Sequence, residues 1–272
     1  MSQFAVTALR SAAGLVGLPA VLCALLVAAA APADGGPINL ITNGDFTAYT
    51  QTPGKVTATG VTGWTNNPYS GSNVGYNFLY LSGAVDNTAS LQMWGTNNGG
   101  LNTITDSPVG GNILGMDGAY QQSAMSQTLS GLTIGTQYFV SFYYAGAQQR
   151  NFDGATTERF AVSLLSGNTV LSPGATCATA GVQCTGILNN VSHGFTGWNF
   201  AGFTFTATAA TDTLSFLAIG TPGGQPPFSM LSGVSLQIPE PASIAGLLAG
   251  IGALALVRRR RRGTSAAAPQ GH

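Results

Sequence analysis

The chain has 272 residues, of which 7% are charged and 44% hydrophobic, and 38 of them are Gly. That share of apolar side chains is enough for a core and excludes a wholly disordered chain. The formal net charge is zero, yet residues 34–239 hold three basic against eight acidic side chains, a net charge of −5. This sign of charge excludes an electrostatic nucleic-acid binder. A polar surface made of hydroxyls and amides is typical of an exported β-protein.

The first 33 residues have the pattern of a secretory signal peptide. Arg10 is their only charge, an apolar stretch follows over residues 14–31, and an A-x-A site ends at Ala33 before Asp34. This pattern predicts cleavage between Ala33 and Asp34, and therefore export. The alternative, a first membrane helix, is disfavoured by the cleavage site and by the small residues that precede it.

Short alternating runs separated by Gly, Asn and Pro recur between the two ends and predict strands. In chain order, strands are expected at residues 40–46, near 129, and at 138–145, 160–164, 203–207, 214–218 and 234–236. The segment 138–145, YFVSFYYA, carries apolar or aromatic side chains on both faces, so we expect a central strand with both faces largely covered. Residues 203–208 alternate Phe or Ala with Thr, which predicts a half-buried strand with a hydroxylated outer face. Eight or so short strands indicate an all-β sandwich of two sheets.

Several segments of this body resemble the galactose-binding-like jelly roll of sugar-binding modules and sorted exoproteins. They are NLITNGDF at 39–46, Gly63-Trp64, SQTLSGLTIGTQYFVSFYYA at 126–145, residues 198–207, and PPFSMLSGVSL at 226–236. The resemblance covers most of residues 38–237 and implies a jelly-roll β-sandwich as a single domain over residues 34–237. It also implies a structural Ca²⁺ near the first and last strands, with Asp45 as a candidate ligand. This chain has Ser232 where relatives usually have Asp, which weakens that ligand set.

Cys177 and Cys184 are the cysteines that remain once the signal peptide has taken Cys23 with it. An even pair in an exported chain predicts a disulfide, here across a loop rich in Gly and Thr. The alternative, a metal-binding pair, lacks nearby ligands, because His193 is nine residues further on and alone.

Sugar recognition uses exposed aromatic rings beside amides and acids that bind hydroxyls. GMDGAYQQSAM places Asp117, Tyr120 and Gln121 together, and LQMWGTNNGG places Trp94 beside two asparagines. These four residues are the candidate carbohydrate-binding residues. Trp64 and Trp198 each follow a glycine of the recurring pattern, and we expect them to fill the core.

The sequence carries no motif for catalysis, and we predict that the protein is not an enzyme. His193 is the single histidine of the body and there is no G-x-S-x-G nucleophile elbow. Glycoside hydrolysis needs two paired carboxylates, for which Asp117, Asp153 and Glu158 are candidates only because acids are scarce. The glycines never form a phosphate-binding loop.

The end of the chain combines three features in a fixed order. The tripeptide Pro239-Glu240-Pro241 is held extended by its prolines. An apolar run over residues 242–257 follows, and counted from Ile238 it has about 20 residues, enough for a transmembrane helix. The run ends in a basic cluster of Arg258, Arg259, Arg260, Arg261 and Arg262. These guanidinium groups act as a stop-transfer signal and orient the helix with the body outside.

Residues 238–262 resemble the PEP-CTERM sorting signal of bacteria that make extracellular polysaccharide. The resemblance implies recognition by an exosortase, a membrane-embedded enzyme that removes the tail near Pro239-Glu240-Pro241. The protein is then an inner-membrane precursor that is later held at the cell surface or in the extracellular matrix. A short tail, 263–272, follows the arginines, where relatives usually end sooner. The alternative is a plain C-terminal anchor.

Taken together, these features favour a structural or interaction role in the exopolysaccharide or biofilm matrix. The first alternative is a carbohydrate-binding module for cell-surface or matrix polysaccharide, and the second is a glycoside hydrolase. No cofactor is expected beyond the Ca²⁺ that the resemblance implies.

Overall fold

A computed structural model describes residues 38–238, apart from residues 54–56. The predicted signal peptide, the cleavage site at Ala33, the Pro239-Glu240-Pro241 tripeptide, the apolar run 242–257 and the five arginines lie outside the described residues. None of the described residues belongs to a helix long and apolar enough to cross a membrane.

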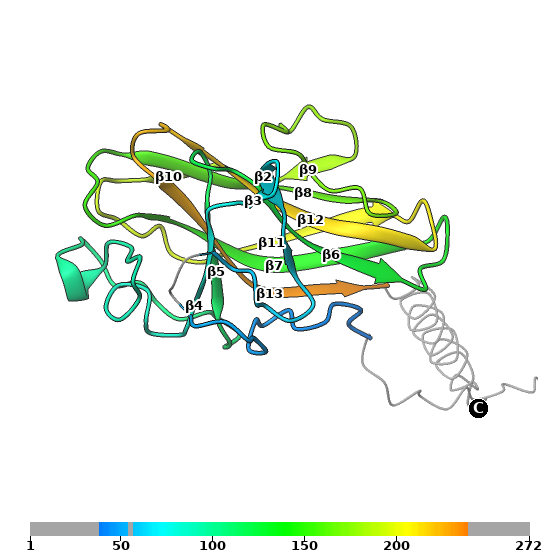
Figure 1. The fold of residues 1–272 in the computed structure, drawn as a ribbon, viewed down its shortest axis with the longest axis horizontal. Coiled ribbons are helices and arrows are strands. Elements are labelled where there is room, and N and C mark those ends of the chain that lie inside the picture. The colour runs from blue at the N-terminus through cyan, green and yellow to red at the C-terminus, as the bar shows by residue number, and fades with distance from the viewer. Residues whose placement is uncertain (1–37, 54–56, 239–272) are drawn as a thin grey trace, which may run out of the picture. The chain divides into compact units, whose positions relative to one another are not determined.

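The described residues form a jelly-roll β-sandwich of two antiparallel sheets (Figure 1). The six-stranded sheet has the order β1 (Thr65–Asn66), β6 (Ala124–Ser130), β12 (Thr211–Thr221), β8 (Thr156–Ser166) and β10 (Leu188–Asn190), with β9 (Val182–Cys184) also paired to β8. The five-stranded sheet has the order β11 (Asn199–Thr206), β7 (Gln137–Gln148), β13 (Pro227–Gln237), β5 (Ile113–Asp117) and β4 (Asn77–Tyr80). A small hairpin joins β2 (Pro68–Ser70) to β3 (Asn73–Val74), and the 3-10 turn η1 covers Thr96–Asn98.

The core between the sheets follows the alternation of the strands. Tyr138, Val140 and Phe142 of β7 are buried and face inward. Phe142 packs edge-on against Phe216 of the opposite sheet, with ring centroids 5.0 Å apart. Such edge-to-face pairs add to the apolar area that the rings bury. Trp64 also lies in this core, as predicted.

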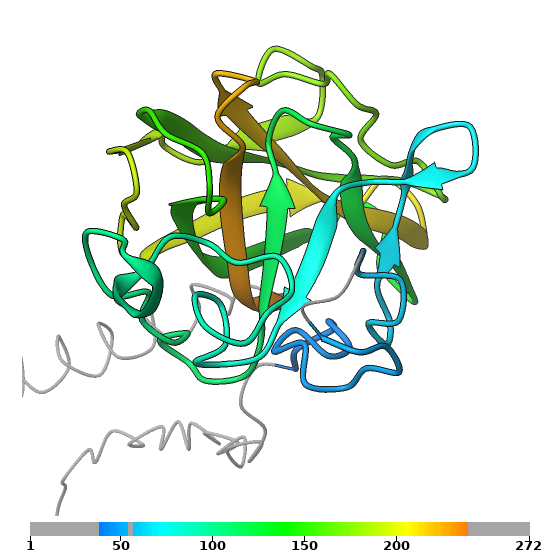
Figure 2. The same ribbon diagram turned by 60° about the vertical axis from the view of Figure 1, so that its left-hand side comes forward.

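A second apolar cluster covers the outer face of the five-stranded sheet. Phe78, Ile113 and Phe228 project from β4, β5 and β13 and pack against Val85 and Met93 of the long connection 81–112. Figure 2 shows this connection crossing in front of the sheet. The outer face is therefore closed over β4, β5 and part of β13, and ligands can approach it only around the edges of the cover.

Two sequence expectations need correction. Residues 40–46 form no strand; they run as turns and bends, held by a bond from the Leu40 amide to the Leu236 carbonyl and by the side chain of Gln127. The segment 138–145 does form a central strand, but its second face is half-covered, since Phe139, Ser141 and Tyr143 remain partly exposed. The cover formed by residues 81–112 does not extend fully over β7 and β11, which the local sequence does not reveal.

Candidate functional site

Three chain connections meet at one end of the sandwich. The antiparallel register pairs Asp117 with Phe228, and it pairs Pro227 with Gln148. The end of β5, the end of β7 and the start of β13 therefore lie side by side. The connections β5–β6, β7–β8 and β12–β13 all leave the sheets here, at the end opposite to Gln237.

These connections enclose a hollow of about 210 Å³, which we call the Asp117 pocket. Its walls are Tyr76, Asp117, Tyr120, Gln149, Phe152, Gly223, Gly224 and Pro226. Aromatic rings and a proline provide most of the wall, while one carboxylate, one amide and the hydroxyls of the two tyrosines provide its polar side-chain groups. This combination of apolar surface with a few polar groups is typical of a small-molecule site.

Asp117 is the last residue of β5, on the outer face of the five-stranded sheet, and is 1% exposed. Its Oδ1 accepts hydrogen bonds from the amides of Ala119 (2.8 Å) and Tyr120 (2.9 Å). Its Oδ2 is buried and has no hydrogen-bond partner among the described residues. Burial raises the pKa of Asp117 to about 6, although the two amides favour the ionised form. An unpartnered buried oxygen is costly, and the Asp117 carboxylate that carries it belongs to the pocket wall.

The aromatic wall is built from two neighbouring tyrosines. Tyr120 is 53% exposed, and its ring meets that of Tyr76 edge-on at a centroid distance of 5.3 Å. Burial and the nearby Asp117 carboxylate raise the pKa of Tyr76, so its hydroxyl stays protonated and able to donate. The two rings thus present an apolar face and a donor beside the Asp117 carboxylate.

A close backbone contact positions the turn that carries Tyr120. The Gly220 amide donates to the carbonyl of Gly118 (3.0 Å), and a Cβ at Gly118 would lie 2.4 Å from the Gly220 nitrogen. A side chain at Gly118 would therefore push the β5–β6 turn away from the end of β12. The glycine brings Asp117 and Tyr120 against the β12–β13 connection.

Trp94 lies behind the pocket instead of lining it. Its indole Nε1 donates to the carbonyl of Phe152 (2.8 Å), and its ring stacks on His193 at a centroid distance of 4.1 Å. His193 Nε2 in turn contacts Asp153 Oδ1 at 2.5 Å. Trp94 and His193 therefore support the connection that places Phe152 in the pocket wall.

Gln121 follows Tyr120 but does not line the pocket. It adopts a left-handed backbone with φ of 44°, and its Nε2 donates to the hydroxyl of Tyr120 (3.1 Å). Gln121 therefore orients the ring that does line the pocket.

Trp198, expected in the core, is only partly buried, and its Nε1 donates to the carbonyl of Thr105.

A second buried acid, Glu158, points away from this pocket. It lies on β8 and faces the interior between the sheets, where a Cβ at Gly146 would be 2.5 Å from its Oε2. Thr156 Oγ1 donates to its Oε1, while Oε2 has no partner among the described residues. Burial raises the pKa of Glu158 to about 8. Asp117 and Glu158 thus lie on opposite faces of the five-stranded sheet and cannot flank one glycosidic bond, as a hydrolytic carboxylate pair must.

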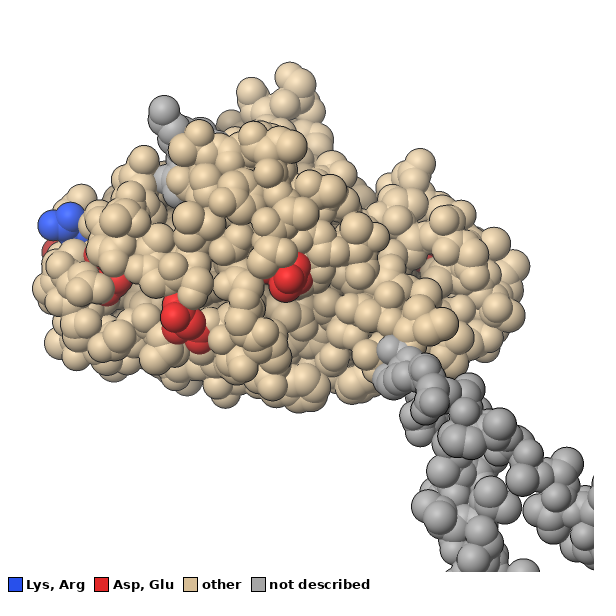
Figure 3. All heavy atoms as spheres, turned by 90° about the horizontal axis from the view of Figure 1, so that it is seen from below, with Lys and Arg blue, Asp and Glu red and all other residues tan. Residues whose placement is uncertain are grey.

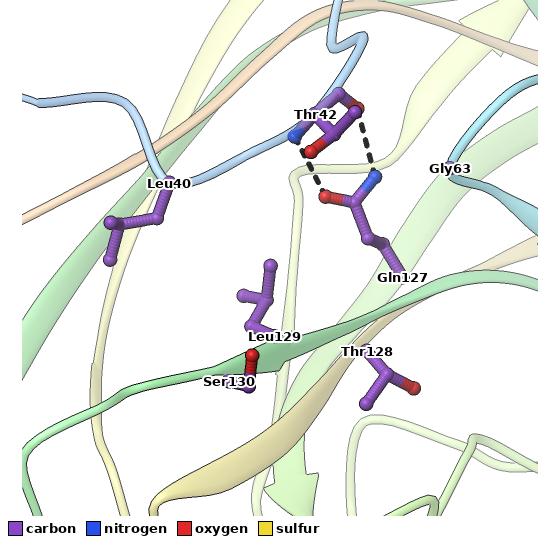
Figure 4. A pocket seen from close by; sticks show the side chains of 7 residues that line it. All are labelled: Leu40, Thr42, Gly63, Gln127, Thr128, Leu129 and Ser130. Carbon is purple, nitrogen blue, oxygen red and sulfur yellow. Dashed lines mark hydrogen bonds between the residues drawn. The ribbon is translucent and has the colours of Figure 1, made fainter.

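Another hollow, of about 250 Å³, lies beside β6 and has a different character (Figure 4). Here the side chain of Gln127 accepts from the Thr42 amide and donates to the Thr42 carbonyl, each at 2.8 Å. The side chain of Gln127 thus makes the pair of hydrogen bonds with Thr42 that the backbone of a neighbouring strand would otherwise make. No aromatic ring lines this hollow, and the side chain of Gln127 already bonds to the backbone of Thr42 through both its oxygen and its nitrogen.

Asp45, the candidate calcium ligand, lies in an exposed turn, and the polar groups around it bond to one another. Its carboxylate accepts from Thr47, and the side chain of Asn112 donates to the Phe46 carbonyl. Ser232 donates to the Asn112 carbonyl (3.1 Å). Among the described residues, no three His, Cys, Asp or Glu side chains gather as a metal-binding group. We derive no role for Ca²⁺ from this structure.

Two other features of the surface are a disulfide and the distribution of charge. Cys177 and Cys184 form a disulfide with a Cα separation of 5.7 Å, which ties the β8–β9 connection to β9. On the face drawn in Figure 3, charged side chains form small separate spots with no extended patch. That face is largely uncharged, in keeping with the composition.

The fold and the end-of-sandwich pocket define an all-β protein of the jelly-roll class. Comparison with known proteins adds that the chain carries a PEP-CTERM protein-sorting motif at residues 237–262. The motif marks the chain as an exported protein that is sorted through the membrane. No curated protein sequence matches the chain.

Three solved structures illustrate the similarity in fold. An enzymatically active domain of tailspike protein 4 from bacteriophage CBA120 is 11% identical with a TM-score of 0.38, and the match covers 74% of this chain but only 21% of that one. The module TmCBM61, solved with β-1,4-galactotriose, is 12% identical with a TM-score of 0.33, and 73% of this chain and 97% of that one are covered. A CBM4 structure is 17% identical with a TM-score of 0.32, covering 72% of this chain and 98% of that one.

Proposed function

We propose that this exported protein binds a carbohydrate in the Asp117 pocket. The observation that carries the proposal is the Asp117 carboxylate, which has one oxygen without a partner among the described residues and which lines a pocket walled by aromatic rings. Binding would hold the protein to a glycan of the cell envelope or of the extracellular polysaccharide matrix.

The chemistry of the pocket matches that of a sugar ring. A pyranose has an apolar CH face, which packs on rings such as Tyr120 and Phe152, and hydroxyls, which donate to a carboxylate oxygen. A hydrogen bond from a sugar hydroxyl to the Asp117 carboxylate is charge-assisted, and therefore stronger than one between neutral groups. The volume of about 210 Å³ is below that of pockets for drug-sized ligands. We therefore expect the pocket to take one sugar unit, with the rest of the glycan outside.

Affinity electrophoresis tests this function. The polysaccharide extracted from the producing cells is cast into the gel, and the purified protein is expected to migrate more slowly than in a plain gel. Asp117→Ala should abolish the retardation, whereas Asp45→Ala, which removes an exposed acid outside the pocket, should leave it unchanged. Unretarded wild-type protein would refute the proposal and leave a purely structural role as the better explanation.

We further propose that an exosortase processes the chain at Pro239-Glu240-Pro241, while the arginines Arg258–Arg262 keep the end of the precursor in the cytoplasm. The motif match at residues 237–262 supports this step. Replacing Pro239 and Glu240 by Ala should leave the full-length mass and a membrane-bound protein. Pro269→Ala, in the tail beyond the arginines, is the matched control and should be processed normally. An unchanged mature mass and location in the double variant would contradict exosortase processing.

A further inference from the structure

A second hollow adjoins the Asp117 pocket. It has a volume of about 170 Å³, and its walls are Ser90, Leu91, Gln92, Gln149, Arg150 and Asn151. Gln149 belongs to the walls of both hollows. A glycan unit in the Asp117 pocket therefore has its neighbouring unit or substituent within reach of this second hollow, which we call the Arg150 hollow.

Arg150 is held in place by one neighbour. Its amide donates to the Gln92 carbonyl (2.8 Å), and its guanidinium donates to Gln92 Oε1 (2.9 Å). The side chain of Gln92 is itself fixed, because its Nε2 donates to the Asn87 carbonyl (2.6 Å). These contacts orient the guanidinium but use only part of its five N–H donors.

The guanidinium lacks an acidic partner. The ion pair found among the described residues joins His193 and Asp153, and no carboxylate of those residues lies within salt-bridge distance of Arg150. Arg159, the other arginine of the body, lies on β8 with its side chain on the outer face of the six-stranded sheet, because its neighbour Phe160 faces the core. Arg150 is therefore an oriented cation beside the pocket that forms no ion pair within the described residues.

We infer that the Arg150 hollow binds a carboxylate of an acidic sugar, such as a uronate unit of the glycan whose neighbouring unit occupies the Asp117 pocket. This inference rests on the proposed function. Guanidinium matches a carboxylate with two parallel hydrogen bonds. Because the body carries a net charge of −5 over residues 34–239, its overall field repels polyanions. Recognition is therefore local, and it requires a carboxylate at one defined position of the glycan.

Chemical reduction of the glycan tests the inference. The polysaccharide from the producing cells is compared before and after carbodiimide activation and borohydride reduction, which converts uronate carboxylates into alcohols. The wild-type protein should bind the reduced polymer about two- to fivefold more weakly, the range of an exposed ion pair. Arg150→Gln should bind both polymers equally, at the level of wild type on the reduced one. Arg159→Gln removes the same charge elsewhere and should behave as wild type.

The outcomes separate the two proposals. Equal wild-type affinity for both polymers, or a preference retained by Arg150→Gln, would overturn the carboxylate site while leaving sugar binding in place. Binding of both polymers about tenfold weaker in Tyr120→Ala, together with loss of only the preference in Arg150→Gln, is the result expected if both proposals hold. Failure of the wild type to bind either polymer would refute the proposed function, and the carboxylate site with it.

Discussion

Asp117 and Glu158 make a useful comparison, because they are the two acids of the described body whose pKa burial raises clearly. Each is 1% exposed and each keeps one oxygen without a partner. They differ in surroundings: Asp117 lines a hollow walled by rings, whereas Glu158 is enclosed between the sheets against Gly146. Burial and a raised pKa therefore do not by themselves identify a binding residue. What distinguishes Asp117 is that it lines a pocket.

The comparison predicts a large pH effect on stability from Glu158. Because its pKa is raised from 4.5 to about 8 on folding, the folded state holds a proton that the unfolded state has lost at intermediate pH. Stability is then greatest below the unfolded pKa and falls as pH rises toward 8, with a slope of at most about 1.4 kcal/mol per pH unit. Between pH 6 and 8, the free energy of unfolding should decrease by about 2 kcal/mol in total. Chemical denaturation at several pH values measures this decrease.

The variant Glu158→Gln tests whether Glu158 causes the pH dependence of stability. The amide cannot ionise, so the slope between pH 6 and 8 should largely disappear. Asp45→Asn, an exposed acid, should leave the slope as in wild type. A steep slope that persists in Glu158→Gln would show that another group causes it, and would contradict the prediction.

The second prediction concerns the ring beside Asp117. Tyr120→Ala removes an exposed aromatic face from the pocket and should weaken polysaccharide binding by about tenfold, since rings of this kind dominate binding energies. Phe200 is 59% exposed, close to the 53% of Tyr120, but it lies on β11 and packs against Tyr143. Phe200→Ala is therefore the matched control, with expected wild-type retardation in the affinity gel. If both variants weaken binding equally, the pocket is not the site.

The smallest expected effect is the pH dependence of binding. The ionised Asp117 carboxylate accepts a stronger hydrogen bond from a sugar hydroxyl than the neutral acid does. With its pKa at about 6, the affinity should fall about threefold as pH decreases from 7.5 to 5. Asp117→Asn should bind more weakly at pH 7.5 and show no such change over this range. An affinity that is constant with pH in wild type would argue against a direct contact between Asp117 and the sugar.

The sequence allowed the sandwich to be predicted, because most of its strands alternate regularly. The runs at 138–145, 160–164 and 214–218 fall within β7, β8 and β12. Residues 40–46 were predicted wrongly as a strand, since their contacts with Leu236 and Gln127 come from segments far away in the chain. The sequence also did not predict the cover over the five-stranded sheet, because the apolar residues of this cover are spread over the irregular connection 81–112.

The pocket was predicted only in part, because several of its residues come from segments that are far apart in the chain. Asp117 and Tyr120 are three residues apart, and the structure places both in one hollow. Phe152, Gln149 and Tyr76 were missed because they come from other connections and meet Asp117 only through the register of β5, β13 and β7. The glycine pair at 223–224 predicts a turn in the β12–β13 connection. It does not predict that this turn lies against Asp117 in the pocket wall. Trp94 contributes through the position of Phe152 instead of contacting the pocket itself.

Strand β13 sets the distance between the Asp117 pocket and the start of the sorting motif. It is 11 residues long, starting at Pro227, next to the pocket wall at Pro226, and ending at Gln237, where the sorting motif begins. At about 3.3 Å per residue, the strand spans about 35 Å. A copy held through its C-terminus would have the Asp117 pocket at the end of β13 opposite to the point of attachment. In such a copy, the proposed carbohydrate site would be about 35 Å from that point.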